Sequence, residues 1–488
     1  MIPPLNYPQT SRKKSARTLF ARVFRPGAVV LTLLWLLPLV AAAQSFRSGV
    51  VYELESQVAP GMALDVASAS TASGANVQIW TYGGGNNQKW KAIDVGGGYW
   101  SFAPLHAPDK RLNVGGASSA NGANVTQSTS NGTTAQKWKA YSNGDGTYSL
   151  EPQCAPGKRL NVAGGGTANG TNVEIWASSG VASQKWKFIP LPGTYRPDGT
   201  TTGPIPGTTL TTVSGDFNVT ANNQLVQNLD INGRLNTGAF SNVVVRNCII
   251  RGTAMTGADT ETYCIISAND NSRGLLVEDC RIVGRGNPWC SATGSGNYTI
   301  RRTEISNTPD GLGLRSALGN VTAEACWIHN GYFLEWDATT PNRPAAGGYY
   351  THVDGVQFHR GKNYVFRGNM IGGVRAPYDH HSGHQADIQA ADDMYNAAFM
   401  IKQEVDNSLA NKIENVLIED NWLEGGASTI NMASGRDNDF SSTTIRNNRF
   451  IRSTWGAQYY ILRPPGLGVF TNNVFDDDGT PVPITTGA

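Results

Sequence analysis

The sequence predicts an all-β protein in which two different repeating modules are joined by a linker. Only 16% of the 488 residues are charged, whereas Gly occurs 56 times, which is typical of turn-rich β architecture. One repeat has a constant period of 48 residues, and a second, less regular repeat begins after about residue 212. A chain of this length is also expected to contain more than one domain.

Residues 1–43 have the features of a secretory signal peptide. They contain no Asp or Glu, and six basic residues precede an apolar run over residues 28–40 and three consecutive Ala at 41–43. A membrane anchor is the alternative, but the run is short for a bilayer span. We therefore expect a secreted, extracellular monomer without stable membrane insertion. Removal of this segment lowers the net charge from +2 to about −4, and no basic stripe indicates a nucleic-acid partner.

The first repeat covers residues 47–190 and occurs three times without an insertion. Each copy contains Leu-Asp/Asn-Val, then Asn-Val, and closes with Gln-Lys-Trp, and each signal recurs at an interval of 48 residues. Short strand-like runs broken by Gly and Asn lie between these signals, as in all-β modules. The closing tryptophans are expected to be core residues, and they are Trp90, Trp138 and Trp186.

Three Gln-x-Trp motifs at this spacing resemble the ricin-type β-trefoil lectins, which also serve as carbohydrate-binding modules. The resemblance implies a sugar site in a lobe that has three features: an acidic residue after the first Leu, an aromatic ring about fifteen positions later, and an Asn beside the Gln of Gln-x-Trp. The ring matches the apolar face of a sugar, and the carboxylate accepts hydrogen bonds from its hydroxyls.

The three lobes match this pattern to different degrees. The first lobe has the full set of Asp65, Trp80 and Asn87, so it is the predicted carbohydrate-binding site. The third lobe has a partial set, with Asn161, Trp176 and Ser183 at the same positions, and Asn161 and Trp176 are also predicted to bind carbohydrate. The second lobe lacks the ring and is expected not to bind, since it has Asn113, Ser128 and Ala135. The alternative is that Asp65 is a turn residue and Trp80 a packed one.

A proline-rich linker and a second repeat follow. Five prolines between residues 190 and 206 predict an extended, solvated spacer over residues 191–212. In the second repeat, over residues 213–480, the sixth residue of each strand-like segment is Cys, Thr or Asn and the eighth is Ile, Leu or Phe. The segments are 243–250, 275–282, 298–305, 321–328, 364–371, 416–423, 443–450 and 468–475.

Such segments, with stacked Asn or Cys at one corner, predict a solenoid of short coils. The region resembles the right-handed parallel β-helices of the pectate-lyase-like superfamily; a propeller is the alternative. Cys248, Cys280 and Cys326 are then expected to be reduced corner residues. Cys264 and Cys290 lie one coil apart, and a disulfide between them stays open as an alternative.

Candidate residues for chemistry gather where the solenoid pattern is interrupted, at residues 329–363 and 372–415. Six of the seven histidines lie between 329 and 384, and loops on rigid scaffolds commonly carry function. Asp310 and Asp354 occupy matching positions on consecutive coils, so their backbones should stack about 4.8 Å apart. Such a pair shares a proton or binds a hard cation such as Ca²⁺, unless each Asp-Gly only marks a turn.

These residues are consistent with more than one activity. In a polysaccharide lyase, a cation or Arg neutralises a uronate carboxylate while a basic residue removes the C5 proton. In a polygalacturonase-like glycoside hydrolase, two carboxyls act as acid and base at a separation of roughly 6.5–9.5 Å. We favour the lyase, because adjacent coils bring the carboxylates closer than that. A non-enzymatic adhesin is the third alternative. The candidate catalytic residues are Asp310, Asp354, His352, Lys402 and His384, and the candidate substrate-binding residues are Arg315, Arg360, Lys362 and Arg375.

Overall fold

The computed structural model describes most of the chain from residue 47 onward. The described residues are 47–253, 263–268, 272–285, 290–331, 353–372, 397–401, 412–425, 428–432, 442–452, 459–463 and 468–486. Residues 42–488 form one compact unit. The predicted signal peptide lies outside the described residues. Within the described part of the chain, no helix is long and apolar enough to cross a membrane.

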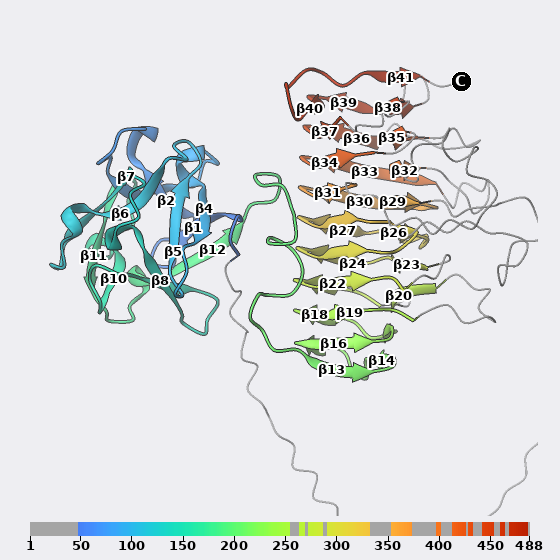
Figure 1. Cartoon of the computed structure of the whole chain (residues 1–488), viewed down its shortest axis with the longest axis horizontal. Coiled ribbons are helices and arrows are strands. Elements are labelled where there is room, and N and C mark those ends of the chain that lie inside the picture. The colour runs from blue at the N-terminus through green and yellow to red at the C-terminus, as the bar shows by residue number, and fades with distance from the viewer. Residues whose placement is uncertain are drawn as a thin grey trace, which may run out of the picture. The chain divides into compact units, whose positions relative to one another are not determined.

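Residues 51–190 form a β-trefoil of twelve antiparallel strands (Figure 1). The strands are β1 (Val51–Ser56), β2 (Met62–Val66), β3 (Val77–Thr81), β4 (Trp90–Asp94), β5 (Trp100–Pro104), β6 (Lys110–Val114), β7 (Ala123–Thr129), β8 (Trp138–Ser142), β9 (Tyr148–Pro152), β10 (Lys158–Val162), β11 (Thr171–Ala177) and β12 (Trp186–Pro190). Six short 3₁₀ turns connect them: η1 (Ala67–Ala69), η2 (Asn86–Gln88), η3 (Gly115–Ala117), η4 (Thr134–Gln136), η5 (Ala163–Gly165) and η6 (Ala182–Gln184). Pairing of β1 with β12 closes the module.

The 48-residue period places equivalent side chains around one core. Trp90, Trp138 and Trp186 are all 0% exposed, which confirms their prediction as core residues. Each indole N–H donates to the carbonyl of the Leu 26 residues earlier, at 2.9–3.1 Å, so the polar atom of each buried ring is satisfied. The equivalent residues Asn76, Asn124 and Asn172 close a ring in which each side-chain amide donates to the next, at 2.9–3.0 Å.

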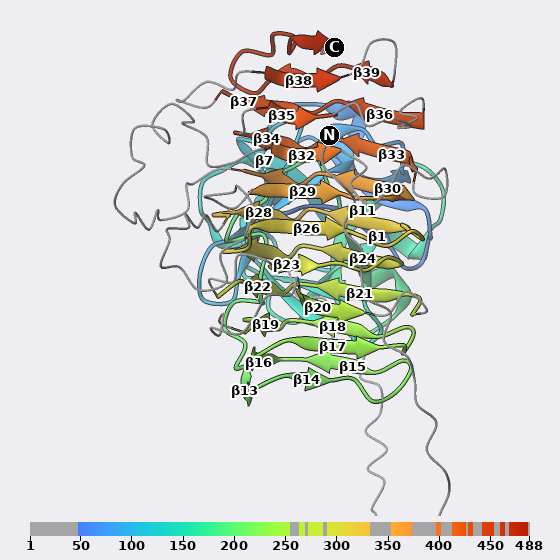
Figure 2. The same ribbon diagram turned by 90° about the vertical axis from the view of Figure 1, so that its right-hand side faces the viewer.

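Residues 211–486 form a parallel β-helix whose coils stack in Figures 1 and 2. Two sheets contain ten strands each and the third contains nine. We call them sheets D, E and F.

The ten strands of sheet D are β13 (Thr211–Ser214), β16 (Leu229–Asn232), β19 (Ile249–Ile250), β22 (Arg281–Val283), β25 (Glu304–Ser306), β28 (Trp327–His329), β31 (Met370–Ile371), β34 (Trp422–Glu424), β37 (Arg449–Ile451) and β40 (Val474–Phe475). The ten of sheet E are β14 (Phe217–Asn218), β17 (Leu235–Gly238), β20 (Tyr263–Ala268), β23 (Cys290–Thr293), β26 (Asp310–Leu314), β29 (Asp354–Phe358), β32 (Ala397–Ile401), β35 (Ser428–Asn431), β38 (Tyr459–Arg463) and β41 (Ile484–Thr486). The nine of sheet F are β15 (Leu225–Gln227), β18 (Val244–Arg246), β21 (Leu275–Glu278), β24 (Tyr298–Arg301), β27 (Val321–Glu324), β30 (Gly361–Arg367), β33 (Ile413–Glu419), β36 (Thr443–Arg446) and β39 (Val469–Thr471).

Each segment that the sequence presents as one short strand is two strands with a bend between them. The first joins sheet F and the second joins sheet D. The fifth residue of every segment has a positive φ, which turns the chain between the sheets. In segment 321–328, for example, this residue is Ala325, at φ 52°. Because residues such as Arg302 and Ala325 rarely adopt this conformation, the sequence did not reveal the bend.

The sixth residue of each segment stacks at this corner, as predicted. Cys248, Cys280 and Cys326 are fully buried thiols. Farther along, four buried asparagines form a ladder, in which the Asn369 side-chain amide donates to Asn421 at 2.9 Å, and the pattern repeats at 2.9 Å in the next two steps. All six cysteines are thiols. In the register Cys264 faces Ser291 and Cys290 faces Tyr263, so Cys264 and Cys290 are offset by one residue and form no disulfide.

A single column of alternating charge runs along sheet F. The last residue of seven consecutive strands is in register with its neighbours: Arg246, Glu278, Arg301, Glu324, Arg367, Glu419 and Arg446. Most acids bridge the arginines on both sides; Glu419, for example, lies 2.6 Å from Arg367 and 2.7 Å from Arg446. Opposite charges on neighbouring strands support the register of the coils.

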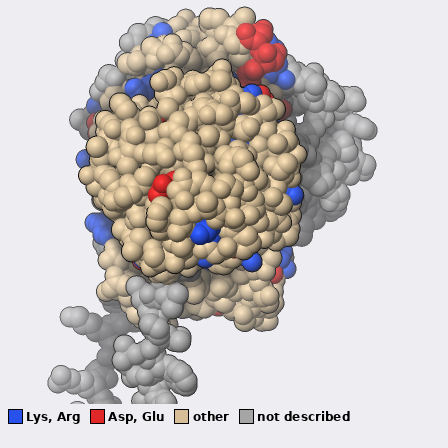
Figure 3. Space-filling model, turned by 90° about the vertical axis from the view of Figure 1, so that its left-hand side faces the viewer, with Lys and Arg blue, Asp and Glu red and all other residues tan. Residues whose placement is uncertain are grey.

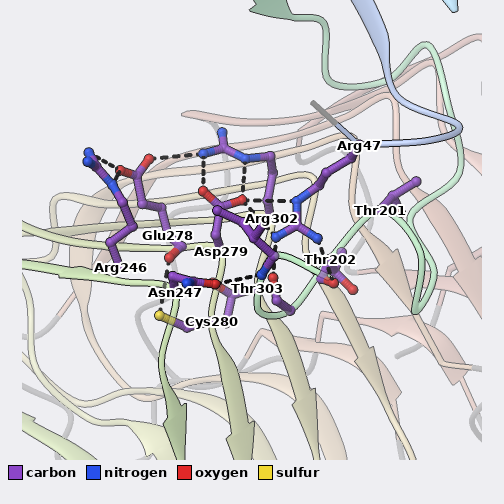
Figure 4. Close-up of polar contacts among 12 residues, drawn as sticks. Arg47, Thr201, Thr202, Arg246, Asn247, Glu278, Asp279, Cys280, Arg302 and Thr303 are labelled. Carbon is purple, nitrogen blue, oxygen red and sulfur yellow. Dashed lines mark hydrogen bonds and ion pairs between the residues drawn. The ribbon is translucent and has the colours of Figure 1, made fainter. Parts of the chain in front are cut away.

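The linker is not the solvated spacer that its prolines predict. Thr201 and Thr202 are only 2% exposed. The guanidinium of Arg47 donates to the carbonyl of Thr202 at 3.1 Å and to Asp279 of the β-helix at 3.2 Å, and Arg302 binds the same carboxylate at 2.8 Å (Figure 4). The backbone N–H groups of this segment are also hydrogen-bonded to protein in place of water at Asp198, Thr200, Thr201, Thr202, Gly203 and Ile205.

Candidate functional site

The first lobe of the trefoil brings its three predicted site residues together. Asp65 on β2 lies opposite Gln78 on β3, while Asn87 comes from η2. Gln78 donates to one oxygen of the Asp65 carboxylate at 3.0 Å, and Asn87 donates to the other at 2.7 Å. The carboxylate is thus held by two side-chain amides in a fixed orientation.

Beside this carboxylate lies an exposed aromatic surface. The side chain of Trp80 is 44% exposed, although large rings usually pack inside, so the alternative of a packed residue is wrong. Asp65 is a strand residue only 4% exposed, which excludes a turn role. Both line a pocket of about 650 Å³ together with Gln78, Asn87 and the residues of η1. Burial raises the pKa of Asp65, against the opposing effect of its hydrogen bonds to Gln78, Gln88 and Asn87.

A neighbouring lobe contacts the strand that carries Trp80. The side-chain oxygen of Asn169 accepts hydrogen bonds from the backbone N–H and the hydroxyl of Thr81, at 2.7 and 3.0 Å. Gly170 has a φ of +85°, and a Cβ placed on it would stand 3.8 Å from the edge of the Trp80 ring. The third lobe therefore fixes the strand that carries Trp80. The sequence pattern of a single lobe could not reveal this contribution.

The third lobe also brings its predicted residues together, and the second does not offer a ring. Trp176 is 44% exposed, like Trp80. Asn161 accepts a hydrogen bond from Ser183 at 2.9 Å and donates one to Glu174 at 3.1 Å. In the second lobe, Asn113 donates to Thr126 at 3.3 Å, and the position of the ring is taken by Ser128.

Comparison with known proteins agrees with this geometry. The model of the family described as "Ricin-type beta-trefoil lectin domain-like" matches residues 35–128, 105–176 and 134–239. The N-terminal module is a ricin-type β-trefoil. We refer to it below as the ricin-type domain.

Several solved structures resemble the ricin-type domain. A designed three-fold symmetric protein, ThreeFoil, is 40% identical, covering 29% of this chain and 99% of that one, with a TM-score of 0.28. The exo-β-1,3-galactanase 1,3Gal43A from Clostridium thermocellum is 30% identical over 30% of this chain and 32% of its own, with a TM-score of 0.29. The Rhizoctonia solani agglutinin is 25% identical over 31% of this chain and 100% of its own, with a TM-score of 0.28. No curated protein matches the sequence.

In the β-helix, Asp310 and Asp354 are in register on adjacent strands of sheet E, as predicted. Each begins a strand, β26 or β29, so neither marks a turn. Asp354 is 0% exposed and Asp310 is 8% exposed. Arg315 lies 3.4 Å from Asp310 and donates to the hydroxyl of Ser291 at 3.2 Å.

These described residues do not by themselves make the predicted Ca²⁺ site. The guanidinium of Arg315 already faces the Asp310 carboxylate, and a cation placed there would be repelled by it. Within the described residues, no group of three or more His, Cys, Asp or Glu side chains is arranged to hold a metal ion. Ca²⁺ therefore stays a prediction. Among the described residues, Asp310 forms an ion pair with Arg315.

His359 is a candidate residue that the sequence did not single out. It follows β29 as Arg315 follows β26, and its backbone N–H donates to the carbonyl of Leu314 at 3.1 Å. Burial, together with the nearby charges of Arg315 and Arg360, lowers the pKa of His359 to about 4. Its imidazole is therefore neutral at neutral pH. Arg315 and His359 each directly follow one of the two aligned strands that begin with Asp-Gly. This shared position could have identified His359 from the sequence.

The other candidates are only partly brought together. Arg360 donates to the carbonyl of Arg315 at 2.6 Å, so it contacts the residue whose side chain pairs with Asp310. Lys362 is on β30 of sheet F, not on sheet E, and is exposed there. His329 belongs to β28, where its ring stacks on Trp327 at 3.5 Å and is 6% exposed; it is a packed strand residue and not part of an inserted loop. His352, His384, Lys402 and Arg375 lie outside the described residues.

Proposed function

We propose that the ricin-type domain binds carbohydrate through the first-lobe site of Asp65, Trp80 and Asn87. The observation that carries this proposal is the exposed Trp80 ring beside a carboxylate held by two amides. A flat ring and a fixed acceptor match a pyranose, which offers an apolar C–H face and vicinal hydroxyl donors. The face of the ricin-type domain in Figure 3 carries few charged side chains, which favours a neutral saccharide.

Substitutions at this site test the proposal. Trp80→Ala removes the stacking surface, and Asp65→Asn removes the charge while keeping the size of the side chain. Each is expected to weaken binding to the polysaccharide that the full chain retains by at least about tenfold, about 1.4 kcal/mol. Asn113→Ala, a change at the equivalent position of the ringless second lobe, is the matched control. It should leave the retention of the protein by polysaccharide in affinity electrophoresis unchanged. Unaltered retention of the Trp80→Ala and Asp65→Asn variants would refute the assignment.

We further propose that the β-helix degrades a uronate-containing polysaccharide, with a lyase favoured over a hydrolase. Arg315 lies close to Asp310, and Arg360 contacts the carbonyl of Arg315; guanidinium groups of this kind are suited to pairing with a substrate carboxylate. The neutral imidazole of His359 is suited to accepting the C5 proton. Loss of that proton and cleavage of the C4–O bond would leave a C4=C5 double bond in one product, while the departing oxygen takes up a proton from water to become the hydroxyl of the other. The adjacent position of Asp310 and Asp354 is too close for the separation that an inverting hydrolase needs.

The mass of the products distinguishes these activities. The full chain is incubated with neutral and uronate polysaccharides, with and without Ca²⁺, and the fragments are weighed. Fragments lighter by one water than hydrolysis products would identify a lyase, and hydrated fragments would identify a hydrolase. No fragments from such a panel, with the polysaccharide still retained, would favour the adhesin. A dependence on Ca²⁺ would support the predicted metal site at Asp310 and Asp354.

The two proposals belong to one secreted protein, exported through residues 1–43 and active as a monomer outside the cell. A binding module joined to a degrading module raises the local concentration of substrate. Removal of the ricin-type site should therefore reduce cleavage of insoluble polysaccharide more than cleavage of short soluble oligosaccharides.

A further inference from the structure

The residues that turn the chain between sheets F and D form a corner column that changes in its middle. Every residue of this column has a positive φ, between 47° and 64°. The first two and the last two are Asn, which is enriched in this region, and their amides stack: Asn247 donates to Asn228 at 2.6 Å, and Asn472 donates to Asn447 at 3.3 Å. Five consecutive coils between them instead carry Asp279, Arg302, Ala325, Gly368 and Asp420. Because Arg and Ala rarely adopt this conformation, the turn alone does not explain their presence.

The linker lies along this middle part of the corner column. A Cβ on Gly368 would stand 2.2 Å from the backbone nitrogen of Gly193, so a side chain at residue 368 would collide with the linker. In the next coil Asp420 contacts the same linker residue, since a Cβ on Gly193 would stand 2.6 Å from the Cβ of Asp420. On sheet D beside the corner, a Cβ on Gly199 would stand 3.4 Å from the ring of Trp327. At residue 368 the linker backbone therefore occupies the space that a stacked side chain would need.

The other end of the linker is hydrogen-bonded to the same column. The N–H of Gly203 donates to the carbonyl of Arg302 at 3.0 Å. The N–H of Ile205 donates to the side-chain oxygen of Asn247 at 2.6 Å. Residues 193–205 thus contact the corner column from Asp420 to Asn247, and they pass its coils in the reverse of chain order.

The ricin-type domain contacts the middle of the corner column directly. Ala325 is buried in the hydrophobic core cluster of that domain, together with Tyr52 and Tyr195. Arg47, which precedes the first strand of the trefoil, donates its guanidinium to Asp279 at 3.2 Å (Figure 4). The backbone N–H of Arg47 donates to the hydroxyl of Tyr52 at 3.1 Å, which joins this ion pair to the core. One coil of the β-helix thus supplies part of the core of the trefoil.

The charges at this contact are buried. Arg47, Asp279 and Arg302 are each no more than 4% exposed. One carboxylate accepts from both guanidinium groups, since Arg302 donates to Asp279 at 2.8 Å. Arg47 also donates to the carbonyls of Thr202 and Gly203, so the linker supplies two of its acceptors. Separation of the modules would break these charge-assisted hydrogen bonds and expose apolar core surface to water, and both effects oppose it.

We propose that this corner of the β-helix is a docking surface whose partner is the ricin-type domain of the same chain, and that the two modules form one rigid body. The five residues that replace Asn mark the extent of the surface. A saccharide bound by the ricin-type domain is then held at a constant position relative to sheet E, whereas a flexible tether would let that position vary. Docking of this kind requires neither a particular saccharide nor an activity of the β-helix.

The test cuts the linker beyond its docked residues. A recognition sequence for a site-specific protease is inserted into the full chain between Pro206 and Gly207, which are both exposed. Complete cleavage is verified by denaturing electrophoresis, and the mass of the particle is measured by size-exclusion chromatography with light scattering at decreasing concentration. The two pieces are expected to remain together as one particle with the mass of the intact chain. Two separate particles at every concentration would overturn the proposal.

Two substitutions locate the contact. Arg47→Met removes the charge and keeps the length of the side chain. Ala325→Asn supplies the residue that the turn prefers, so the β-helix should fold, but it inserts a polar amide into the core of the trefoil. Each should raise the concentration at which half of the cleaved chain dissociates by at least about tenfold. The matched controls should leave this concentration unchanged: they are Arg159→Met, whose ion pair with Glu151 lies within the trefoil, and Asn447→Ala, outside the docked part of the corner column.

The outcomes separate docking from general effects on stability. Near-ultraviolet circular dichroism and the unfolding midpoint of each uncut variant check that it is folded, and Arg47→Met decides by itself if Ala325→Asn does not fold. Release of the pieces by Arg47→Met and Ala325→Asn, but not by the controls, would support the docking surface. Pieces that stay together equally in all variants, or that the controls release to the same extent, would overturn the role of the corner column.

Discussion

The charge column of sheet F predicts that Glu278→Gln destabilises the β-helix strongly. The Glu278 side chain is 3% exposed and contacts three arginines. Arg246 at 2.5 Å and Arg302 at 3.0 Å are labelled in Figure 4, and Arg301 lies at 2.7 Å. Glutamine has nearly the same shape but no charge, and its amide group would place N–H donors against an arginine donor. The change therefore removes the electrostatic partner without opening a cavity.

The expected cost follows from burial. Removing one partner of a buried charge pair costs about 3–5 kcal/mol, because the remaining charge stays desolvated. Arg302 keeps its contact with Asp279, which offsets part of this cost, so we expect about 3 kcal/mol. With a urea m-value of about 3 kcal/mol/M, the unfolding midpoint of the β-helix would fall by about 1 M.

The pH dependence of the same group gives an independent check. Burial raises the pKa of Glu278, but the charges of Arg301, Arg302 and Arg246 outweigh it, and the net pKa is lowered. A lowered pKa means that the ionised form stabilises the fold above the ordinary pKa of Glu, and that this stability is lost as the pH falls through the folded value. The difference between wild type and Glu278→Gln should therefore shrink in acid.

The matched control is Glu324→Gln in the same column. The Glu324 side chain is 24% exposed and its ion pair with Arg367 is 3.2 Å long, so its loss should cost less than about 1 kcal/mol. Urea unfolding followed by far-ultraviolet circular dichroism measures both variants. Equal midpoints for the two would refute the argument that burial makes the column stabilising.

Three further predictions follow from particular side chains. Asn421→Ala should lower the free energy of unfolding, measured by urea denaturation, by about 3 kcal/mol. The change removes the 2.9 Å hydrogen bond of the buried Asn369 amide and the 3.0 Å hydrogen bond of the Phe366 carbonyl. A cost below about 1 kcal/mol would contradict this prediction. Saccharide binding at the first lobe, measured by calorimetry, should weaken as the pH falls through the raised pKa of Asp65, since only the carboxylate accepts two hydroxyl donors, and Asp65→Asn should be insensitive to pH there. If His359 accepts the substrate proton, the acid limb of the rate profile lies near its pKa of about 4 and not near 6.5.

The trefoil could be predicted almost fully from the sequence because its period is constant. With no insertion in three copies, Trp90 and its two equivalents identify the core, and Asp65 and Trp80 identify the site by their spacing from it. Glu174 could not be identified in this way, because the motif specifies an acid only at the position of Asn161 and not at the position that faces it on the next strand. The facing strands of the hairpin together preserve the carboxylate and its hydrogen bond.

The β-helix could be predicted only in part, for two physical reasons. Positive φ at residues such as Ala325 depends on stacking against adjacent coils, which local sequence does not report. The placement of Arg315 and His359 together depends on the register of strands that are 44 positions apart, and not on a motif. By contrast, the stacked asparagines were predictable because the sixth residue of each segment recurs in every coil.

Variation in coil length points to sheet E as the functional face. The connection from sheet F to sheet D has two residues in every coil from β18 to β40, and the charge column and the corner ladder stabilise it on either side. By contrast, the connections that enter sheet E range from short turns to residues 330–353 and 372–396. A scaffold held in register along one corner tolerates insertions at the others, since loop closure costs little more as a loop lengthens. The candidate residues Asp310 and Asp354 begin strands of this sheet, so insertions there would alter the proposed activity without altering the fold.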